Sequence, residues 1–475
     1  MKEEAPRGWS VEPLGAVVDV LDRLRVPVNE RERRTRLEAS TRRFPYYGAT
    51  GRVGEIDDFL LEGESVLLGE DGAPFLDVDR RKAYLVSGRY WVNNHAHILR
   101  ARPPHSNAFL CHQLNAIRFD AFVSGTTRLK LTQSAMTTIP LRLPPPAEQR
   151  RIVSRIDELF SELDEGERAL ERVQTLVERY RDAVLRSAVT GELTKDWREL
   201  NPASSGKRTF QIFSDARAQA GRTTTPVAMA DVEGLPQLPA GWAWTSLDAV
   251  ADVVGGITVD RKRSGSGCEV VPYLRVANVQ RGYLELGEVK TIAAPRDRIE
   301  QLRLRSGDIL FNEGGDIDKL GRGWIWQAEL PLCIHQNHVF RARLYTPGPW
   351  NKLISWFGNV LGRRLFMDMG KQTTNLASLS LSKLKSIPVP VMSEAEAAEI
   401  VSRVEDALSV VDKCLADLSA QRQRSASLRQ SVLNAAFSGR LVPQDPTDEP
   451  ASALLARLAA QAAETAPAPR RRARR

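Results

Sequence analysis

The chain has 475 residues, of which 27% are charged and 42% are hydrophobic, proportions that are ordinary for a soluble protein. Nothing at its start resembles a signal peptide, and no apolar run reaches the ~18 residues that a membrane span needs. The net charge is +8, but the closing stretch RRRARR contributes five of these charges. Any nucleic-acid surface must therefore come from local basic clusters and not from bulk charge.

The cysteines give a second constraint. They lie far apart and form no CxxC pair: Cys111, Cys268, Cys333 and Cys414. Isolated cysteines suit a reducing compartment, so we expect the protein in the cytoplasm. The same spacing argues against a zinc module, and we expect no metal site.

The first globular segment covers residues 1–145. Between residues 22 and 43, eight arginines stand against four acids, which fits either a solvated helix face or a surface that faces phosphates. Residues 45–72 contain short β-type runs punctuated by glycine, as in a compact strand-rich domain. These glycines lack the strand-to-helix switch of a dinucleotide-binding loop, so we expect no cofactor there.

Residues 147–190 carry a heptad pattern, in which apolar residues recur at alternating spacings of three and four. Because side chains at these spacings share one helix face, the pattern predicts a long helix with a narrow seam for a partner helix. Pro144 to Pro146 precede the pattern and Gly191 follows it, as is typical of helix ends. The predicted seam consists of Ile152, Ile156, Leu159, Leu163, Leu170, Val173, Val177, Tyr180 and Val184.

The partner helix lies in the same chain. AEAAEIVSRVEDALSVVD at 395–412 repeats AEQRRIVSRIDELFSELD at 147–164 with eight of eighteen positions identical. The opening GWSVEPLGAVV also recurs, as GWAWTSLDAVA, so the duplication predicts two equivalent halves. Two polar residues, Gln421 and Ser425, fall on the second seam, and we expect them to weaken it locally and to fix its register. Its apolar positions are Ile400, Val404, Ala407, Val411, Leu418, Leu428 and Val432.

We therefore expect an α+β protein with an internal pseudo-twofold repeat. Two globular domains of mixed α and β structure would be separated by two long helices that form an antiparallel coiled coil. The alternative is that each amphipathic helix packs only on its own domain. The predicted segments are a first domain (1–145), a first helix (146–190), a linker (191–238), a second domain (239–393), a second helix (394–440), and a C-terminal helix with a disordered basic tail (441–475).

Two related stretches carry histidine beside amide side chains. WVNNHAHILRA at 91–101 has a counterpart in IHQNHVFRARL at 334–344. The histidines in these stretches could be metal ligands, but no further ligands follow at a recognisable spacing, which favours hydrogen-bonded histidine. Asn and Gln are also side chains that bond the edges of bases.

The chain lacks the common catalytic motifs. It has no GxxxxGK[ST] phosphate loop, no HExxH and no GxSxG nucleophile elbow. The paired acids Glu70 and Asp71 lack the lysine of a nuclease-like pattern, and acids in turns are mostly turn formers. We therefore expect a non-catalytic protein.

Taken together, these stretches resemble the specificity subunit of type I restriction-modification enzymes. That family pairs two target-recognition domains, each followed by a segment of the form IPxxLPPxxEQ and a long helix that closes on AFxGxL. This chain has IPLRLPPPAEQRRI at 139–152 with AVTGEL after its helix, and IPVPVMSEAEAAEI at 387–400 with AFSGRL. PYYGATG with WVNNHAH looks like one class of target-recognition domain. The second copy departs from the pattern at Met392-Ser393 and at Ala397.

The resemblance implies a non-catalytic subunit that binds duplex DNA at an asymmetric, bipartite site. It also implies that the chain holds two methyltransferase subunits, and that a restriction and translocase subunit joins them. S-adenosylmethionine, ATP and Mg²⁺ would then be bound by these partner subunits. The alternatives are a coiled-coil scaffold whose ends bind proteins and a degenerate single-chain methyltransferase. A salt-dependent shift of duplex DNA would separate the DNA reader from the scaffold.

Residue type and loop context suggest which side chains contact DNA. In the first domain we expect Tyr47, Arg52, Asn93, Asn94, His95, Arg128 and Lys130. In the second domain we expect Arg261, Lys262, Arg263, Lys319, Arg322, Gln336, Asn337 and His338.

Overall fold

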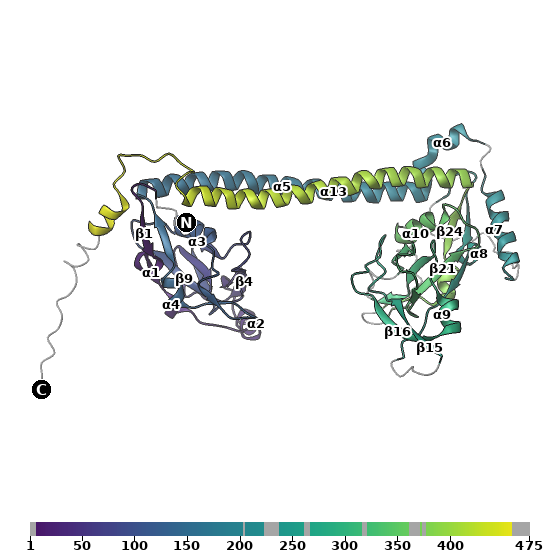
Figure 1. Ribbon diagram of the computed structural model, residues 1–475, viewed down its shortest axis with the longest axis horizontal. Coiled ribbons are helices and arrows are strands. Elements are labelled where there is room, and N and C mark those ends of the chain that lie inside the picture. The colour runs from purple at the N-terminus through teal and green to yellow at the C-terminus, as the bar shows by residue number, and fades with distance from the viewer. Residues whose placement is uncertain are drawn as a thin grey trace. The chain divides into compact units, whose positions relative to one another are not determined.

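A computed structural model describes residues 6–202, 205–222, 237–260, 267–315, 321–360, 371–372 and 377–457. The chain divides into two compact units, unit 1 (1–172 and 417–475) and unit 2 (173–416). Two long helices, α5 (Pro146–Thr190) and α13 (Glu394–Phe437), each contribute one part to unit 1 and the other to unit 2 (Figure 1). Among the described residues, no helix is both long and apolar enough to cross a membrane.

The described part of unit 1 contains two four-stranded sheets, a two-residue hairpin of β10 (Val123–Ser124) with β11 (Lys130–Leu131), and a short strand pair. The first sheet is antiparallel, in the order β2 (Val18–Val20), β9 (Ala96–Ala101), β6 (Ser65–Gly69) and β7 (Ala83–Val86). The second has the order β4 (Gly51–Ile56), β3 (Phe44–Gly48), β8 (Arg89–Val92) and β5 (Leu61–Glu62). The pair consists of β1 (Ser10–Pro13) and β12 (Pro140–Leu143). Every residue of β6, SVLLG, is buried, as expected of a strand that is covered on both faces.

The helices of unit 1 close its core. Ser106 caps α3 by accepting a hydrogen bond from the backbone of Phe109, and Phe109 packs edge-on against Phe437 of α13, with 5.4 Å between the ring centroids. The long helices therefore supply part of the core of the domain. The remaining elements are α1 (Leu14–Val17), η1 (Asp22–Leu24), α2 (Glu30–Glu38), α3 (Asn107–Ala116), β10 (Val123–Ser124), β11 (Lys130–Leu131) and α4 (Gln133–Thr137).

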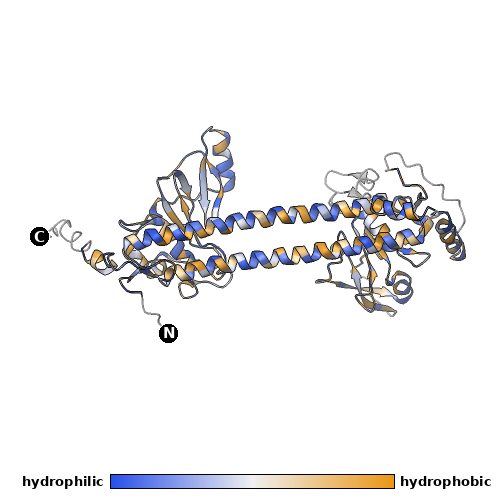
Figure 2. Ribbon diagram, turned by 90° about the horizontal axis from the view of Figure 1, so that it is seen from above, coloured by the Kyte–Doolittle hydropathy of each residue, from blue (hydrophilic) through white to orange (hydrophobic). Residues whose placement is uncertain are grey.

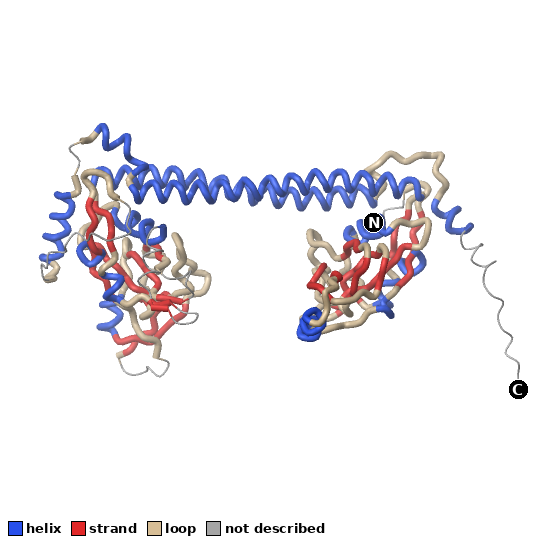
Figure 3. Tube along the Cα trace, turned by 180° about the vertical axis from the view of Figure 1, so that it is seen from behind, coloured by secondary structure: helices blue, strands red, loops and turns tan. Residues whose placement is uncertain are grey.

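Unit 2 repeats this plan, and Figure 3 shows the strands of each unit gathered into one body. Its main sheet is antiparallel, in the order β14 (Ala251–Val254), β21 (Val339–Leu344), β17 (Ile309–Asn312) and β19 (Gly323–Ile325). A second sheet has the order β16 (Lys290–Pro295), β15 (Cys268–Leu274) and β20 (Ile334–His335). The pair β13 (Ala243–Ser246) and β24 (Pro388–Val391) corresponds to β1 and β12.

Helices and short strands complete unit 2. Ser380 caps α12 by accepting a hydrogen bond from the backbone of Lys383, and an apolar core forms where α8, α10 and α12 meet the ends of the long helices. The helices are η2 (Glu192–Thr194), α6 (Lys195–Leu200), α7 (Lys207–Gln219), α8 (Leu247–Val250), α9 (Arg296–Leu302), α10 (Trp350–Val360) and α12 (Leu381–Lys385). The short strands are β18 (Gly314–Gly315), β22 (Lys371–Gln372) and β23 (Ala377–Ser378).

The predicted internal repeat is confirmed at the level of strand register. Val66 lies opposite Leu99 in unit 1, and in unit 2 Ile309 lies opposite Ala342, each 243 positions later in the sequence. The same offset relates the other paired residues of β6 with β9 and of β17 with β21. The two domains therefore share one sheet plan although few of their residues are identical.

The two long helices are antiparallel in each unit, as predicted. In unit 1, Ser425 of α13 donates a hydrogen bond to Glu167 of α5 (3.0 Å), and Arg429 pairs with Asp164. In unit 2, Arg403 near the start of α13 donates to the carbonyl of Leu193, just past the end of α5 (2.8 Å). Figure 2 shows apolar and polar residues alternating along both helices. The pairing thus rests on an apolar stripe and on polar contacts at its edges.

The predicted seam is only partly buried. Val173, Tyr180 and Leu428 are 44%, 52% and 53% exposed, so these three do not form a closed seam. An α-helix with 3.6 residues per turn drifts away from a strict 3.5-residue repeat, and one partner helix covers only a narrow stripe. At Leu428 the drift turns Arg429 towards α5 instead. Fully buried seam positions are Ile152, Ile156, Val184, Ile400, Val404, Val411 and Leu418. Half-buried positions are Leu159, Leu163, Leu170, Val177, Ala407 and Val432.

The two polar residues predicted on the second seam, Ser425 and Gln421, differ in burial. Ser425 is buried and bonds Glu167, as expected of a polar residue that fixes register. Gln421 is exposed and takes no part in the seam.

The segment interpreted as a linker is ordered over much of its described length. Thr194 donates a hydrogen bond to Glu396 (2.8 Å), and Arg198 pairs with the same carboxylate. Phe213 of α7 packs edge-on against Trp350, with 5.6 Å between the ring centroids. Described residues of the 191–219 stretch therefore pack and pair with other parts of unit 2. The predicted disordered tail lies outside the described residues from residue 458 onward.

Candidate nucleic-acid interface

A tight turn joins β8 to β9 in unit 1 and presents one amide side chain to solvent. The Asn93 carbonyl oxygen Oδ1 accepts a hydrogen bond from the backbone of His95 (2.8 Å), and the Asn93 backbone donates to Tyr47 (3.0 Å). The His95 carbonyl accepts from the backbone of Glu70 (2.8 Å). These bonds hold both ends of the turn, so Asn94, which is exposed, lies on a rigid support.

Basic side chains surround this turn. His95 Nδ1 lies 2.7 Å from the Asp71 carboxylate, which also pairs with Arg128 at 2.7 Å. Lys130 pairs with Glu70 at 3.1 Å. Burial would raise the pKa of Glu70, but hydrogen bonds from Arg25 and Lys130 outweigh it and hold this pKa below its usual range. Two carboxylates therefore position a histidine, an arginine and a lysine beside Asn94.

Unit 2 builds the same turn between β20 and β21. The backbone of Asn337 donates to Ile257 (2.9 Å), and the carbonyl of His338 accepts from the backbone of Glu313 (2.9 Å). His338 Nδ1 lies 2.5 Å from the Glu313 carboxylate. The side chains of His95 and His338 are 38% and 54% exposed, and each faces its carboxylate through Nδ1. Nε2 of His338 lies 3.4 Å from Nδ2 of Asn337. Asn94 and Asn337, and His95 and His338, thus occupy equivalent positions.

The other predicted contacts are less uniform. Tyr47 is half-buried and packs against Tyr84 and Tyr90, so its ring is held in the domain. Arg52 is exposed and pairs with Glu55 at 2.6 Å. Arg322 donates a hydrogen bond to the side chain of Gln280 (2.9 Å), a residue outside the turn of unit 2. Arg261, Lys262, Arg263 and Lys319 lie outside the described residues.

The arginines between residues 22 and 43 do not form one free basic face. Arg33 lies over the ring of Tyr46 at 4.3 Å, and Arg36 lies over Trp91 at 5.0 Å while it bonds Asp57. These two side chains attach α2 to the second sheet. The sequence pattern could not distinguish this packing role from a role in facing phosphates.

Sequence reasoning missed the acids that support the two histidines. Asp71 was interpreted as a turn former, and Glu313 was not singled out. Acids follow a buried strand in both repeats, at GED (69–71) and NEG (312–314). At the offset of 243, however, Glu313 corresponds to Glu70 and Gly314 to Asp71, so the two histidines are supported by acids one position apart. A lone acid at a strand end is common, so the signal is visible only when the repeats are aligned through structure.

One further cluster has the geometry of a cation site. Asp22, Glu70 and His97 offer ligand atoms within 4.8 Å of one another. However, Arg25 pairs with both acids, and His97 contacts Asp22 through Nδ1 (2.6 Å) and the Leu131 carbonyl through Nε2 (2.9 Å). The arginine already supplies the positive charge, so the cluster is an ion-pair network that stabilises the base of the turn.

The chain has two related domains, and antiparallel stretches of the long helices accompany each of them. Each domain carries the same supported turn of amide and imidazole groups. These features define a class of protein with two recognition modules. A family model described as the type I restriction modification DNA specificity domain matches residues 6–172. The EcoKI specificity subunit of Escherichia coli K12 is 23% identical over 380 residues, covering 77% of this chain and 74% of the relative. The EcoDI specificity subunit of Escherichia coli is 24% identical over 443 residues, covering 88% and 89%.

A solved structure supports the fold. A chain from work on complex assembly and conformational transition of the type I R-M system superposes with a TM-score of 0.58 at 17% identity, over 92% of this chain and 100% of that one. Residues 6–172 thus match the DNA specificity domain of type I restriction-modification systems, and the chain is similar over most of its length to specificity subunits of those systems. These similarities support the interpretation of the sequence as a specificity subunit, the non-catalytic component of such an enzyme.

Proposed function

We propose that this specificity subunit reads an asymmetric, bipartite site in duplex DNA through the two equivalent turns. The observation that carries the proposal is the repeated placement of Asn94 beside His95 and of Asn337 beside His338. An amide can donate to and accept from a base edge at the same time, and a carboxylate-backed imidazole offers one further polar edge. Because the two domains differ in sequence around a shared turn, we expect two different short blocks of bases.

Positive charge in this interface is local. Arg128 and Lys130 flank the first turn, and Arg322 lies in unit 2. Side chains of this type position a protein on the DNA backbone, whereas the amides supply sequence discrimination. Binding should therefore weaken steeply as salt increases, while the preference for one sequence should persist.

The partners follow from the similarity to specificity subunits and form the second part of the proposal. Two methyltransferase subunits would bind this chain, and a restriction and translocase subunit would join the complex. S-adenosylmethionine, ATP and Mg²⁺ would be bound by those subunits, and the complex would act in the cytoplasm.

Mapping of methylated adenines tests the proposal. The chain is expressed with its modification subunit in a host without adenine methylation, and the genome is read by single-molecule sequencing. We expect one motif of two unlike blocks separated by unread bases. A continuous motif, or a palindrome without a gap, would contradict the bipartite interpretation. If the purified chain does not bind duplex DNA in a salt-dependent manner, a protein-binding scaffold is the better interpretation.

A further inference from the structure

Arg128 is an exposed arginine whose position is fixed by several contacts. Its side chain is 60% exposed, and its Nη2 donates a hydrogen bond to Oδ1 of Asp71 (2.7 Å). Nδ1 of His95 lies 2.7 Å from the same oxygen. Because one carboxylate oxygen contacts both groups, the guanidinium of Arg128 lies beside the imidazole of the turn at 93–95.

The backbone of Arg128 is fixed as well. Arg128 lies in the connection between β10 and β11, and Leu131 of β11 donates a backbone hydrogen bond to Glu70 (2.7 Å). Gly125, with φ of 108°, shapes this connection, because a Cβ there would lie 2.4 Å from the carbonyl oxygen of Arg128. The hairpin therefore joins Arg128 to the segment that carries Asp71.

The guanidinium also lies against Gly72. A Cβ on Gly72 would be 3.3 Å from Nη2 and 3.4 Å from Nε of Arg128, so a larger residue would crowd the guanidinium. Gly72 itself has φ of 67°, and its backbone donates to the carbonyl of Leu129 (3.4 Å). Asp71 and Gly72 thus hold the guanidinium from two adjacent positions of the chain.

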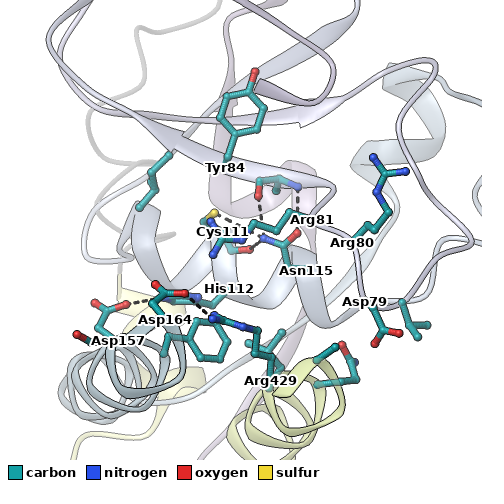
Figure 4. A pocket seen from close by; sticks show the side chains of 18 of the residues that line it. Asp79, Arg80, Arg81, Tyr84, Cys111, His112, Asn115, Asp157, Asp164 and Arg429 are labelled. Carbon is teal, nitrogen blue, oxygen red and sulfur yellow. Dashed lines mark hydrogen bonds and ion pairs between the residues drawn. The ribbon is translucent and has the colours of Figure 1, made fainter. Parts of the chain in front are cut away.

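Another arginine–aspartate pair of unit 1 shows the contrast. Figure 4 shows Arg429 of α13 bonded to Asp164 of α5 beside a hollow. The Arg429 side chain is only 18% exposed and lies over the ring of Phe160 at 5.2 Å, so this pair joins the two helices. The side chain of Arg128 is held by its aspartate but remains open to solvent, as a group that binds a ligand must be.

The remaining donors of Arg128 suit a flat pair of acceptors. A guanidinium carries five N–H donors, and the bond to Asp71 uses one of them. Guanine presents O6 and N7 side by side in the major groove, and a bidentate arginine is the commonest specific contact to them. A phosphate also accepts two bonds, but its attraction depends on positive charge, which Asp71 offsets. A neutral base needs directed donors and no net charge.

We propose that Arg128 reads a guanine through O6 and N7, and that Asp71 and Gly72 are its positioning residues. The inference rests on the proposed function and deepens it, since it assigns one arginine to a base. Lys130, whose ammonium is a point charge without a planar fork, keeps the role on the DNA backbone. Neighbouring base pairs are ~3.4 Å apart along the duplex, so the guanine lies in the block that Asn94 reads.

The arrangement belongs to unit 1. At the offset of 243 that relates the two main sheets, Gly314 stands at the position of Asp71. Gly314 has no side chain, so no carboxylate at this position of unit 2 can hold a histidine and an arginine together. The two blocks of the target should therefore differ at this base.

Replacement of guanine by 7-deazaguanine tests the contact, because the analogue has a carbon in place of N7 and keeps its Watson–Crick face. The duplex carries the motif mapped for the wild-type complex, with the analogue at one guanine at a time. We expect one guanine at which the analogue weakens wild-type binding by about 3- to 30-fold. Arg128→Lys should bind the natural and substituted duplexes equally and keep its salt dependence, because lysine retains the charge but lacks the fork.

Two further variants separate positioning from folding. Asp71→Asn should reduce the effect of the analogue at that guanine although Arg128 is still present. Arg118→Lys is the matched control, since Arg118 is 77% exposed and pairs with Asp120 (3.2 Å) but has no bond to the turn. This control should keep the full effect of the analogue. Melting temperatures of all variants verify that they are folded.

The outcomes distinguish the inference from the proposed function. Equal effects of the analogue on the wild-type and Arg128→Lys complexes would overturn the assignment of Arg128, and so would a motif in which no guanine responds to the analogue. Failure of the proposed function takes another form: the wild-type complex would give a continuous motif or would bind duplex DNA without dependence on salt, and the assignment of Arg128 would fail with it.

Discussion

The indole nitrogen of Trp242 donates a hydrogen bond to Glu396 at 2.9 Å, and both side chains are buried at the start of α13. Trp9 makes the same bond to Glu148 at the start of α5, at 3.1 Å. In each repeat a tryptophan just before the first strand thus fixes the glutamate in the first turn of a long helix. An acid in that turn also interacts favourably with the helix dipole.

The surroundings of the two glutamates differ, and this predicts opposite responses to amidation. Arg198, which is half-buried, pairs with Glu396, so Glu396→Gln removes the negative charge from this pair and should lower the free energy of unfolding by about 1–3 kcal/mol. Burial raises the pKa of Glu148, whose Oε1 has no hydrogen-bond partner among the described residues. Ionisation of Glu148 therefore opposes folding as pH rises above its usual range, and Glu148→Gln should be neutral or stabilising at pH 7. Urea denaturation of the two variants measures both effects, and equal losses would contradict the difference in environment.

The corrected seam predicts which helix positions tolerate charge. Ile156 is fully buried in the core of unit 1, so Ile156→Asp should cost about 4 kcal/mol or more and prevent assembly with partner subunits. Leu428, at a predicted seam position of the other helix, is 53% exposed, and Leu428→Asp should cost no more than about 1 kcal/mol. Thermal melting of each variant provides the comparison. A loss at position 428 as large as at position 156 would restore the strict heptad seam.

Single amides should control single blocks of the target. Asn94→Ala should weaken discrimination in one block by about 1–3 kcal/mol and leave the other block unchanged, and Asn337→Ala should do the reverse. Asn434, exposed on α13 away from both turns, provides the control substitution Asn434→Ala. Binding competition with duplexes altered in one block at a time measures the effect. A uniform loss over all sequences would assign the amides to the DNA backbone instead.

Unit 2 should lose stability in mild acid. Burial lowers the pKa of His335 to about 4, and its Nδ1 lies 2.6 Å from the Val339 carbonyl. In the unfolded chain His335 takes up a proton near pH 6.5, whereas in the folded chain it stays neutral down to about pH 4. The stability of unit 2 is therefore fully present above pH 6.5 and falls as pH decreases towards 4. His335→Phe should lower stability at pH 7 but flatten this dependence, whereas His338→Gln, on the exposed turn, should keep it. Melting temperatures between pH 7.5 and 4.5 distinguish the two.

Much of the architecture could be predicted because its signals are local. The predicted helix 147–190 agrees with α5 to within one residue, because prolines precede it and Gly191 adopts a left-handed conformation, with φ of 78°, directly after it. The internal repeat could be recognised for the same reason, since the helices and their flanking motifs are continuous in sequence. Antiparallel pairing followed from the repeat.

The candidate interface could be predicted only in part, because its contacts join distant residues. The turn at 93–95 carries a recognisable composition, but the pairing of His95 with Asp71 spans 24 positions, and no periodicity reports it. The ordering of the expected linker has the same cause, since Phe213 finds Trp350 only after unit 2 has folded. The seam failed at Leu428 because helical drift accumulates over several turns, which a heptad pattern read by eye does not include.

The antiparallel register bears on how such a chain can arise. Asp164 pairs with Arg429, and the residue equivalent to Arg429 in the first repeat is Arg181. A polypeptide carrying only the first domain and α5 could therefore meet a second copy of itself in the same register, with Asp164 of each copy opposite Arg181 of the other. Such a homodimer of half-length chains would present two identical domains and so would read a symmetric, interrupted palindrome. Fusion of two half-genes, followed by divergence of one domain, would convert that palindrome into an asymmetric site while the helix pair remained unchanged.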